Sequence, residues 1–243
     1  MTPEFITVLA IIALFSVIQS IFGMGVLIFG TPTLLLLEYD FTTTLSFLLP
    51  ASFAISLLQV LGAGSTRVPV SQYLYLVCLP GIGVGFWLAG NSPSASWINF
   101  MVGIMLLFTA LIRLWSPSRK LLSICLRKYL PAYHIVMGVT HGLTNLGGGL
   151  LAILASGTQS EKAAIRYTVA HYYLAFSIVQ VLVLAIILGH FKILFTNSVT
   201  MIVSTSVYTL IGNKLFLRAN NRSFNTALNI FIAIYGVALF LKV

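Results

Sequence analysis

Thr140-His-Gly-Leu-Thr-Asn-Leu-Gly-Gly-Gly-Leu-Leu-Ala-Ile-Leu-Ala155 is apolar enough to lie in a lipid bilayer, yet three consecutive glycines interrupt it. An interior glycine costs a helix about 1 kcal/mol relative to alanine, so the triplet predicts a point where a helix unwinds. Unwound backbone at membrane depth is tolerated only where it is buried in protein or lines a watery cavity. A shorter version of the break occurs in Phe22-Gly-Met-Gly-Val26. We therefore expect the chain to be organised around two breaks.

The composition is that of a helical membrane protein. Of the 243 residues, 59% are hydrophobic and only 7% are charged, and the mean hydropathy is +1.04. Soluble domains carry about 25% charged residues. A β-barrel would show alternating segments of about 10 residues rather than long apolar runs. We expect an all-α polytopic membrane protein whose main partner is the lipid bilayer, without a separate soluble domain.

The basic charge and the two cysteines have simple explanations. A net charge of +9 is expected when Lys and Arg concentrate in cytoplasmic loops, so no nucleic-acid partner is inferred. Cys78 and Cys125 lack metal-ligand spacing and are expected to be packing residues. We expect no cofactor and no metal. Met1-Thr-Pro-Glu-Phe5 has neither a basic region nor a cleavage site, which predicts the start of a membrane segment rather than a signal peptide.

Eight apolar runs divide the chain. Six are assigned as ordinary spanning helices, which need about 20 residues: 41–61, 73–88, 97–114, 165–188, 193–211 and 224–241. The other two runs, 5–37 and 133–156, contain the breaks. As a single helix the first would be about 50 Å long, too long for a hydrocarbon core of about 30 Å. It is also interrupted at Gly30-Thr-Pro32, and each part is short for a full crossing.

The distribution of Lys and Arg selects the topology. If both broken runs cross once, the basic linker and the last basic loop fall on opposite sides. If both runs turn back, only Lys192 and Lys242 lie outside, and all other basic residues lie inside: Arg67, Arg113, Arg119, Lys120, Arg127, Lys128, Lys162, Arg166, Lys214, Arg218 and Arg222. The positive-inside rule therefore predicts re-entrant or hairpin elements and a cytoplasmic basic linker.

The two halves of the chain repeat each other. Residues 53–61 match residues 174–182 at Ala, Ser, Gln, Val and Leu, and Leu88-Ala-Gly-Asn91 matches Leu210-Ile-Gly-Asn213 in part. Gly23-Met-Gly25 corresponds to Gly147-Gly-Gly149 in the same order. A broken hairpin plus three spans in each half predicts inverted repeats, which are typical of secondary transporters. The expected units are a first repeat (1–116), a basic linker (117–131) and a second repeat (132–243).

The breaks are the expected substrate site. In transporters of this design, half-helix N-termini point at anionic groups near the bilayer midplane. A helix N-terminus offers free N–H groups and a partial positive charge, and glycine lets an anion approach them closely. The candidates are Gly23, Gly25, Gly147, Gly148 and Gly149. The alternative is that these glycines only allow close helix packing.

Polar side chains near the breaks extend this prediction. Ser56 with Gln59, and Ser177 with Gln180, are spaced to share a helix face, where they line a cavity or join helices. Thr144 and Asn145 could touch the substrate or cap the second half-helix.

Two histidines are the only ionisable residues that we place well within spans. His141 and His171 could bind an anion or accept a coupling proton, or each could be a satisfied bundle residue. His134 and His190 are expected at the interface. The four acidic residues fall in loops or at the termini, which argues against a carboxylate relay or a sodium site.

The segments Phe22-Gly-Met-Gly-Val-Leu-Ile-Phe-Gly-Thr-Pro-Thr-Leu34 and Asn145-Leu-Gly-Gly-Gly-Leu-Leu-Ala-Ile153 resemble the sulfite exporter TauE/SafE family. The resemblance extends over the whole chain in length, duplication and segment order. It implies a secondary transporter, not an enzyme, in the inner or plasma membrane. The implied substrate is a small anion, usually sulfur-containing, such as sulfite, sulfoacetate or a related organosulfonate, moved by alternating access. A non-transporting assembly or lipid-interacting subunit and an anion channel stay as alternatives, and the sequence predicts no oligomeric state.

Overall fold

The computed structural model describes residues 3–91, 97, 100–105, 128–221, 223 and 226. Within these ranges the chain forms helices and short connections, without a strand. Four helical segments are long and apolar enough to cross a membrane: Glu4–Phe22, Phe41–Leu61, Lys162–Ile187 and Phe191–Arg218. The prediction of an all-α polytopic membrane protein is confirmed.

The first half contains α1 (Pro3–Phe22), α2 (Val26–Leu36), α3 (Phe41–Leu61) and α4 (Leu79–Gly90), the last entered through a π-helical turn at Leu74–Cys78. The predicted break at Gly23–Gly25 separates α1 from α2. The predicted interruption at Gly30-Thr-Pro32 is wrong, because α2 continues through it. A Cβ on Gly30 would lie 2.7 Å from Leu48, so this glycine serves packing. Helix α1, with 20 residues, is also longer than expected.

The second half contains α7 (Leu130–Thr144), α8 (Gly148–Thr158) and α9 (Lys162–Leu182), which a π-helical turn extends to Ile187. After it come α10 (Phe191–Asn197), α11 (Val199–Val207), a π-helical turn at Tyr208–Gly212 and α12 (Asn213–Arg218). The predicted span 224–241, most of the span 97–114 and most of the basic linker lie outside the described residues.

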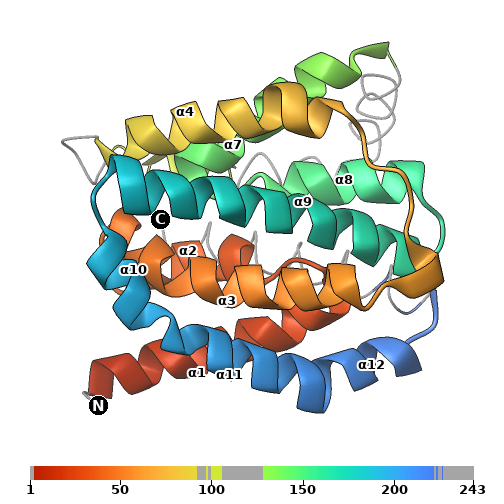
Figure 1. Cartoon of the computed structure of the whole chain (residues 1–243), viewed down its shortest axis with the longest axis horizontal. Helices are drawn as coiled ribbons and strands as arrows, with labels where there is room; N and C mark the ends of the chain where they lie inside the picture. Colours follow the sequence, from red (N-terminus) through yellow and green to blue (C-terminus); the bar gives the residue numbers. More distant parts are fainter. Residues whose placement is uncertain are drawn as a thin grey trace.

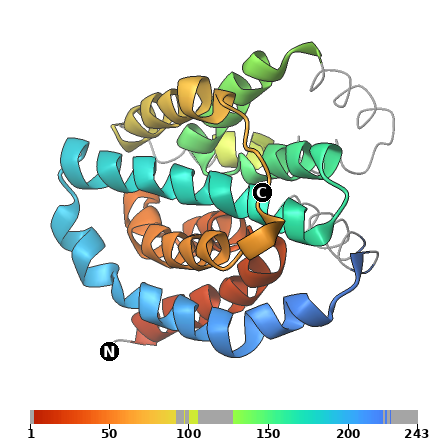
Figure 2. The same cartoon turned by 45° about the vertical axis from the view of Figure 1, so that its right-hand side comes forward.

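Both broken runs turn back on themselves. In Figure 1 the long helices lie roughly side by side, with α3 and α9 packed together in the middle. Helix α1 runs from left to right and α2 returns to the left, whereas α7 enters from the right and α8 returns there. Figure 2 shows the same course from another direction. The two hairpins therefore open toward opposite ends of the bundle.

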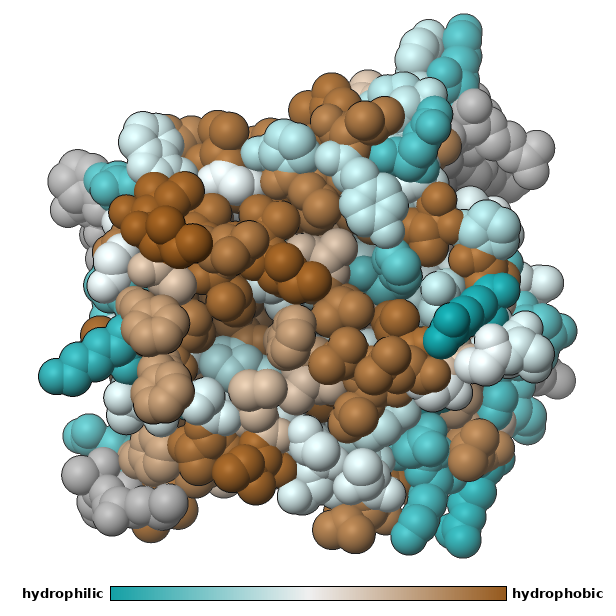
Figure 3. Space-filling model, viewed as in Figure 1, coloured by the Kyte–Doolittle hydropathy of each residue, from teal (hydrophilic) through white to brown (hydrophobic). Residues whose placement is uncertain are grey.

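The ends of the bundle differ in charge. The right-hand end in Figure 1 carries the α3–α4 connection with Arg67, the start of α9 with Lys162 and the end of α12 with Arg218. The left-hand end carries the α2–α3 connection, with Glu38 and Asp40. In Figure 3 apolar residues cover most of the middle of the same face, and hydrophilic residues gather mainly at its right-hand side. An apolar band between unequal polar ends suits a bilayer in one orientation.

Helices α4 and α7 approach closely through glycines. A Cβ on Gly85 would lie 2.8 Å from the Val139 carbonyl oxygen, and a Cβ on Gly142 would lie 2.5 Å from that of Ile82. Gly138 likewise faces the carbonyl of Cys78, which is fully buried. Pairs of small residues four apart are a common way for membrane helices to pack. These glycines hold α7, and with it the second break, against the first half.

Replacing Gly85 with alanine should destabilise the protein, because the new methyl group meets backbone that cannot move aside. Overpacking of this kind costs about 1–3 kcal/mol. The matched control is Gly83→Ala on the same helix, where the nearest neighbour of the new methyl group is Val179 at 3.8 Å. Thermal unfolding of the purified protein should show a lower midpoint for Gly85→Ala only. Equal midpoints would contradict the close α4–α7 contact.

Single cysteines in a background without Cys78 and Cys125 test the orientation of the hairpins. Ser65, Ser160 and Asn220 are exposed at the basic end, and Asp40 and Asn91 are exposed at helix ends on the other side. A membrane-impermeant thiol reagent should label the first three from the cytoplasmic side and the last two from the opposite side. Opposite labelling of Ser65 and Asn220 would mean that the hairpins do not both turn back.

Candidate functional site

The two breaks begin in the same way but differ at the residue before the second helix, where Gly25 has φ 171° and ψ −62° and Gly147 has φ −60° and ψ −12°. Gly23 has φ 80° and Asn145 has φ 61°, both in the left-handed region, and each follows directly on a helix. The Gly23 N–H donates to Gln19 O at 2.8 Å, and the Asn145 N–H donates to His141 O at 2.7 Å. Asparagine tolerates this conformation better than most residues, so Asn145 does what glycine does at position 23.

This equivalence changes the alignment of the repeats. It pairs Gly25 with Gly147, and both lie tightly on the preceding helix: a Cβ would be 2.6 Å from Phe15 O at Gly25 and 2.9 Å from Met137 O at Gly147. Of the triplet, only Gly147 lies in the break, while Gly148 and Gly149 begin α8. The predicted unwinding point thus begins two residues before the triplet, because Asn145 already ends α7.

Gln19, which the sequence analysis did not select, fills the first break. Its Nε2 donates to Ser52 O at 3.0 Å, to Ser52 Oγ at 3.0 Å and to Ser56 Oγ at 3.1 Å. Its Oε1 accepts the Val26 N–H at 3.0 Å. One amide therefore joins α1 to α3 and also caps the first turn of α2.

The predicted residue Gln59 completes this arrangement. Its Nε2 donates to the carbonyls of Gln19 at 2.9 Å and Ser20 at 3.0 Å, at the end of α1. The last carbonyls of a helix lack partners within the helix, so Gln59 supplies one. The structure thus brings Gly23, Ser56 and Gln59 together. Most of their polar side-chain atoms form hydrogen bonds that join α1 to α3.

Asn145 connects the second break to the first half. Its Nδ2 donates to Thr31 Oγ1 on α2 at 2.7 Å, and its Oδ1 accepts from Gln180 Nε2 on α9 at 3.3 Å. The side chain therefore does not cap α8, which was one of the two predicted roles. Thr144 accepts the Leu146 N–H at 3.2 Å within the break. These contacts bring both hairpins and α9 to one place in the bundle.

Beside this junction lies a group of buried polar atoms without hydrogen bonds among the described residues. It comprises both ring nitrogens of His141, the Tyr173 hydroxyl, the Ser177 hydroxyl and Gln180 Oε1. All four side chains have 0% exposure. The His141 ring centroid lies 5.7 Å from that of Tyr173 and 4.5 Å from that of Phe176, and Gln180 is its polar neighbour. Tyr173 was not predicted.

The N-terminus of α8 adjoins the same group. Gly147, at the cap position, offers no side chain to the first N–H groups of the helix. The bond from Gly149 N–H to Leu146 O is long, at 3.4 Å. A Cβ on Gly148 would collide with the Tyr173 hydroxyl, so this hydroxyl lies directly over the first turn of α8. The start of α8, which no side chain caps, therefore lies beside unpaired side chains.

His171 does not join this group. It lies on another face of α9, where its Nε2 and the Tyr75 hydroxyl share a 2.6 Å hydrogen bond. His134, expected at the interface, is fully buried, with its Nδ1 bonded to Leu130 O at 2.8 Å and its Nε2 to the Tyr172 hydroxyl at 2.8 Å. The sequence placed both histidines in helices but could not give the direction in which each points.

Arg166 is a further residue near the first break. It was counted among the cytoplasmic charges at the start of the run 165–188, and it lies within α9, where its guanidinium donates to Ser20 O at 3.2 Å and to Asn213 Oδ1 at 3.2 Å. The guanidinium stacks on Phe216, 3.4 Å from the ring centroid. It therefore binds the end of α1 to α9 and α12.

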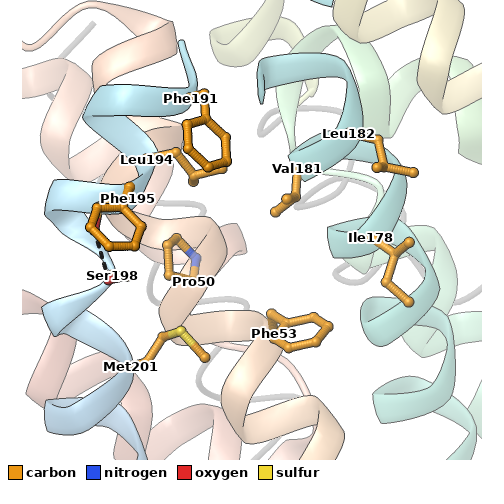
Figure 4. A pocket seen from close by; sticks show the side chains of 10 residues that line it. All are labelled: Pro50, Phe53, Ile178, Val181, Leu182, Phe191, Leu194, Phe195, Ser198 and Met201. Carbon is orange, nitrogen blue, oxygen red and sulfur yellow. Dashed lines mark hydrogen bonds between the residues drawn. The ribbon is translucent and has the colours of Figure 1, made fainter. Parts of the chain in front are cut away.

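A separate pocket of about 320 Å³ lies between α3, α9, α10 and α11 (Figure 4). Its described lining is apolar apart from Ser198, whose hydroxyl donates to Phe195 O at 2.7 Å. The other lining residues are Pro50, Phe53, Ile178, Val181, Leu182, Phe191, Leu194, Phe195 and Met201. A pocket without free donors does not suit an anion, so the break at α8 is the better candidate.

Comparison with known proteins identifies the family. The family described as sulfite exporter TauE/SafE matches residues 8–239, which is nearly the whole chain. No curated protein and no solved structure matches significantly. Two Gly-broken hairpins in an apolar helical bundle agree with the resemblance noted in the sequence. The chain therefore belongs to the sulfite exporter TauE/SafE family and is a membrane transport protein rather than an enzyme.

Proposed function

We propose that the protein is a secondary transporter that moves a small sulfur-containing anion, such as sulfite, sulfoacetate or a related organosulfonate, across the plasma membrane. The observation that carries this proposal is the start of α8, where free backbone donors meet unpaired buried side chains. A helix N-terminus stabilises an anion without a lysine or arginine. The family description supports the sulfur-containing class.

Alternating access is the proposed mechanism. The polar group around His141 has 0% exposure, so neither end of the bundle reaches it in this conformation. The two hairpins open toward opposite ends, which is the arrangement that inverted repeats would give. Movement of one repeat (1–116) against the other (132–243) would expose the site first to one side and then to the other. The basic linker (117–131) would lie in the cytoplasm.

The unpaired atoms favour transport over a purely structural subunit. A structural role predicts that every buried amide and histidine is satisfied, because unsatisfied buried polar groups are rare in stable folds. The first break comes close to that condition, but the second does not. Of the two histidines, His141 is the proposed acceptor of a coupling proton because it adjoins the second break, whereas His171 lies away from it with Nε2 bonded to Tyr75 and Nδ1 unpaired.

The experiment is uptake of radiolabelled sulfite and sulfoacetate by proteoliposomes, with acetate as a carboxylate comparison. Wild-type protein should take up at least one sulfur anion faster than empty liposomes do. Gly148→Val should reduce uptake at least about tenfold, because its side chain would occupy the start of α8 and displace Tyr173.

Gly83→Ala is the matched control, since its neighbours leave room for a methyl group. It should retain wild-type uptake. The two variants must be present in the membrane in equal amounts. Size-exclusion chromatography of the detergent extracts will compare the amounts of folded protein. Full uptake by Gly148→Val would remove the second break from the transport path, and no uptake of any anion by wild-type protein would contradict the proposed function.

A further inference from the structure

We propose that only the second break binds the anion, through His141, Tyr173 and Ser177 beside the first turn of α8, and that Gln19 fills the equivalent place in the first break. The proposal rests on the proposed function, because it assigns the residues and the ligand group of the same transport site. It makes the two halves chemically unequal although their backbones correspond.

Backbone geometry fixes which residues correspond. Gly23 and Asn145 both end a helix in the left-handed conformation, and each donates to the carbonyl four residues earlier, that of Gln19 or of His141. Helices α2 and α8 begin at the same distance beyond them, at Val26 and at Gly148. Gln19 therefore occupies the position of His141, and the first N–H of α2 corresponds to that of α8.

The helices that face the breaks correspond as well. In α3, Ser52, Ser56 and Gln59 are spaced by four and three residues, which places them on one face. In α9, Tyr173, Ser177 and Gln180 have the same spacing, and the sequence repeat aligns the two sets. Each break thus has one helix face with three polar side chains directed toward it.

At the first break Gln59 Oε1 has no hydrogen-bond partner, like Gln180 Oε1 at the second, but the groups that correspond to His141, Tyr173 and Ser177 are all bonded. The Gln19 amide donates to Ser52 and Ser56 and accepts the Val26 N–H. It therefore occupies both the polar face of α3 and the first turn of α2. A ligand could bind here only by displacing Gln19 from all of these bonds.

The second break has the opposite character. Neither ring nitrogen of His141 has a partner at normal hydrogen-bonding geometry, although the Gln180 amide is close enough to interact with the ring, and the hydroxyls of Tyr173 and Ser177 are unpaired. Most buried polar groups in proteins are hydrogen-bonded, and each exception needs an explanation. Several exceptions together at an uncapped helix start are explained if a ligand completes them.

The donors define the ligand. The start of α8, the Tyr173 hydroxyl, the Ser177 hydroxyl and one His141 nitrogen can all donate hydrogen bonds. The two cations of α9 bond elsewhere, Lys162 to Phe216 O and Arg166 to Ser20 O and Asn213 Oδ1. Several donors suit a group with three oxygens on one sulfur, the SO₃ group that sulfite and sulfonates share. A planar carboxylate has only two oxygens and would leave donors unused. The enclosed position next to Gly148 restricts the ligand to a small group.

His141→Gln is the most informative variant, because it gives the second break the residue of the first. The new amide should bond to Ser177 and to the start of α8, as Gln19 bonds to Ser56 and Val26. We expect the unfolding midpoint to rise by about 2 °C or more, while binding of radiolabelled sulfite to the purified protein weakens at least about tenfold. A gain in stability with a loss of binding is not expected of a residue that only packs.

Two variants keep the test interpretable. Tyr173→Phe removes an unpaired buried hydroxyl, so it should weaken sulfite and sulfoacetate binding without lowering the midpoint. Ser52→Ala is the matched change in the first half, where a bonded hydroxyl is lost; it should not raise the midpoint and should leave sulfite binding unchanged.

The outcomes separate this inference from the proposed function. Transport by wild-type protein together with unchanged sulfite binding in His141→Gln and Tyr173→Phe overturns the inference alone. Loss of binding in Ser52→Ala but not in Tyr173→Phe would place the site in the first break. Stronger binding of acetate than of sulfite or sulfoacetate would overturn the assignment of an SO₃ group.

Discussion

The rest of the structure depends on one constraint: inside a bilayer, every backbone group that a broken helix releases must find a partner within the protein. The two breaks release such groups among buried residues of the bundle. Gln59 and Arg166 supply donors to the carbonyls at the end of α1, and Gln19 supplies an acceptor to the start of α2. The packing of α3 and α9 in the centre follows, because these helices carry the side chains that satisfy the breaks.

Function enters where this constraint is not fully met. In the first half a side chain closes the break, and in the second half the equivalent side chain is a histidine without a partner. Cavities and unpaired groups in a core normally cost stability. A transporter can accept that cost at one place, because its substrate supplies the missing hydrogen bonds during each cycle. The two hairpins have similar backbones but different side chains. This difference is enough to make the first hairpin structural and the second a binding site.

Part of this could be predicted from the sequence. Glycines in long apolar runs, and Lys and Arg in loops, predicted two hairpins. The repeat selected Gln59 and Gln180, Asn145 was selected because it precedes the triplet, and His141 because it is ionisable within a span. Gln19 and Tyr173 were missed because the apolar helices of a membrane protein carry little pattern to show which face meets protein and which meets lipid. For the same reason His171 was wrongly grouped with His141. It is two residues from Tyr173 on α9, so it points about 200° away around the helix axis. Arg166 was counted only as a cytoplasmic charge at the start of its span, whereas it also bonds to the end of α1.

The central claim is that a small oxyanion binds at the start of α8. Selenite resembles sulfite in shape and charge, and its selenium scatters anomalously, so crystals grown with selenite test the claim directly. The account predicts one anomalous peak within hydrogen-bonding distance of the Gly148 backbone, His141 and Tyr173. A peak beside Gln19 and Val26, or binding of selenite with no peak at either break, would contradict it.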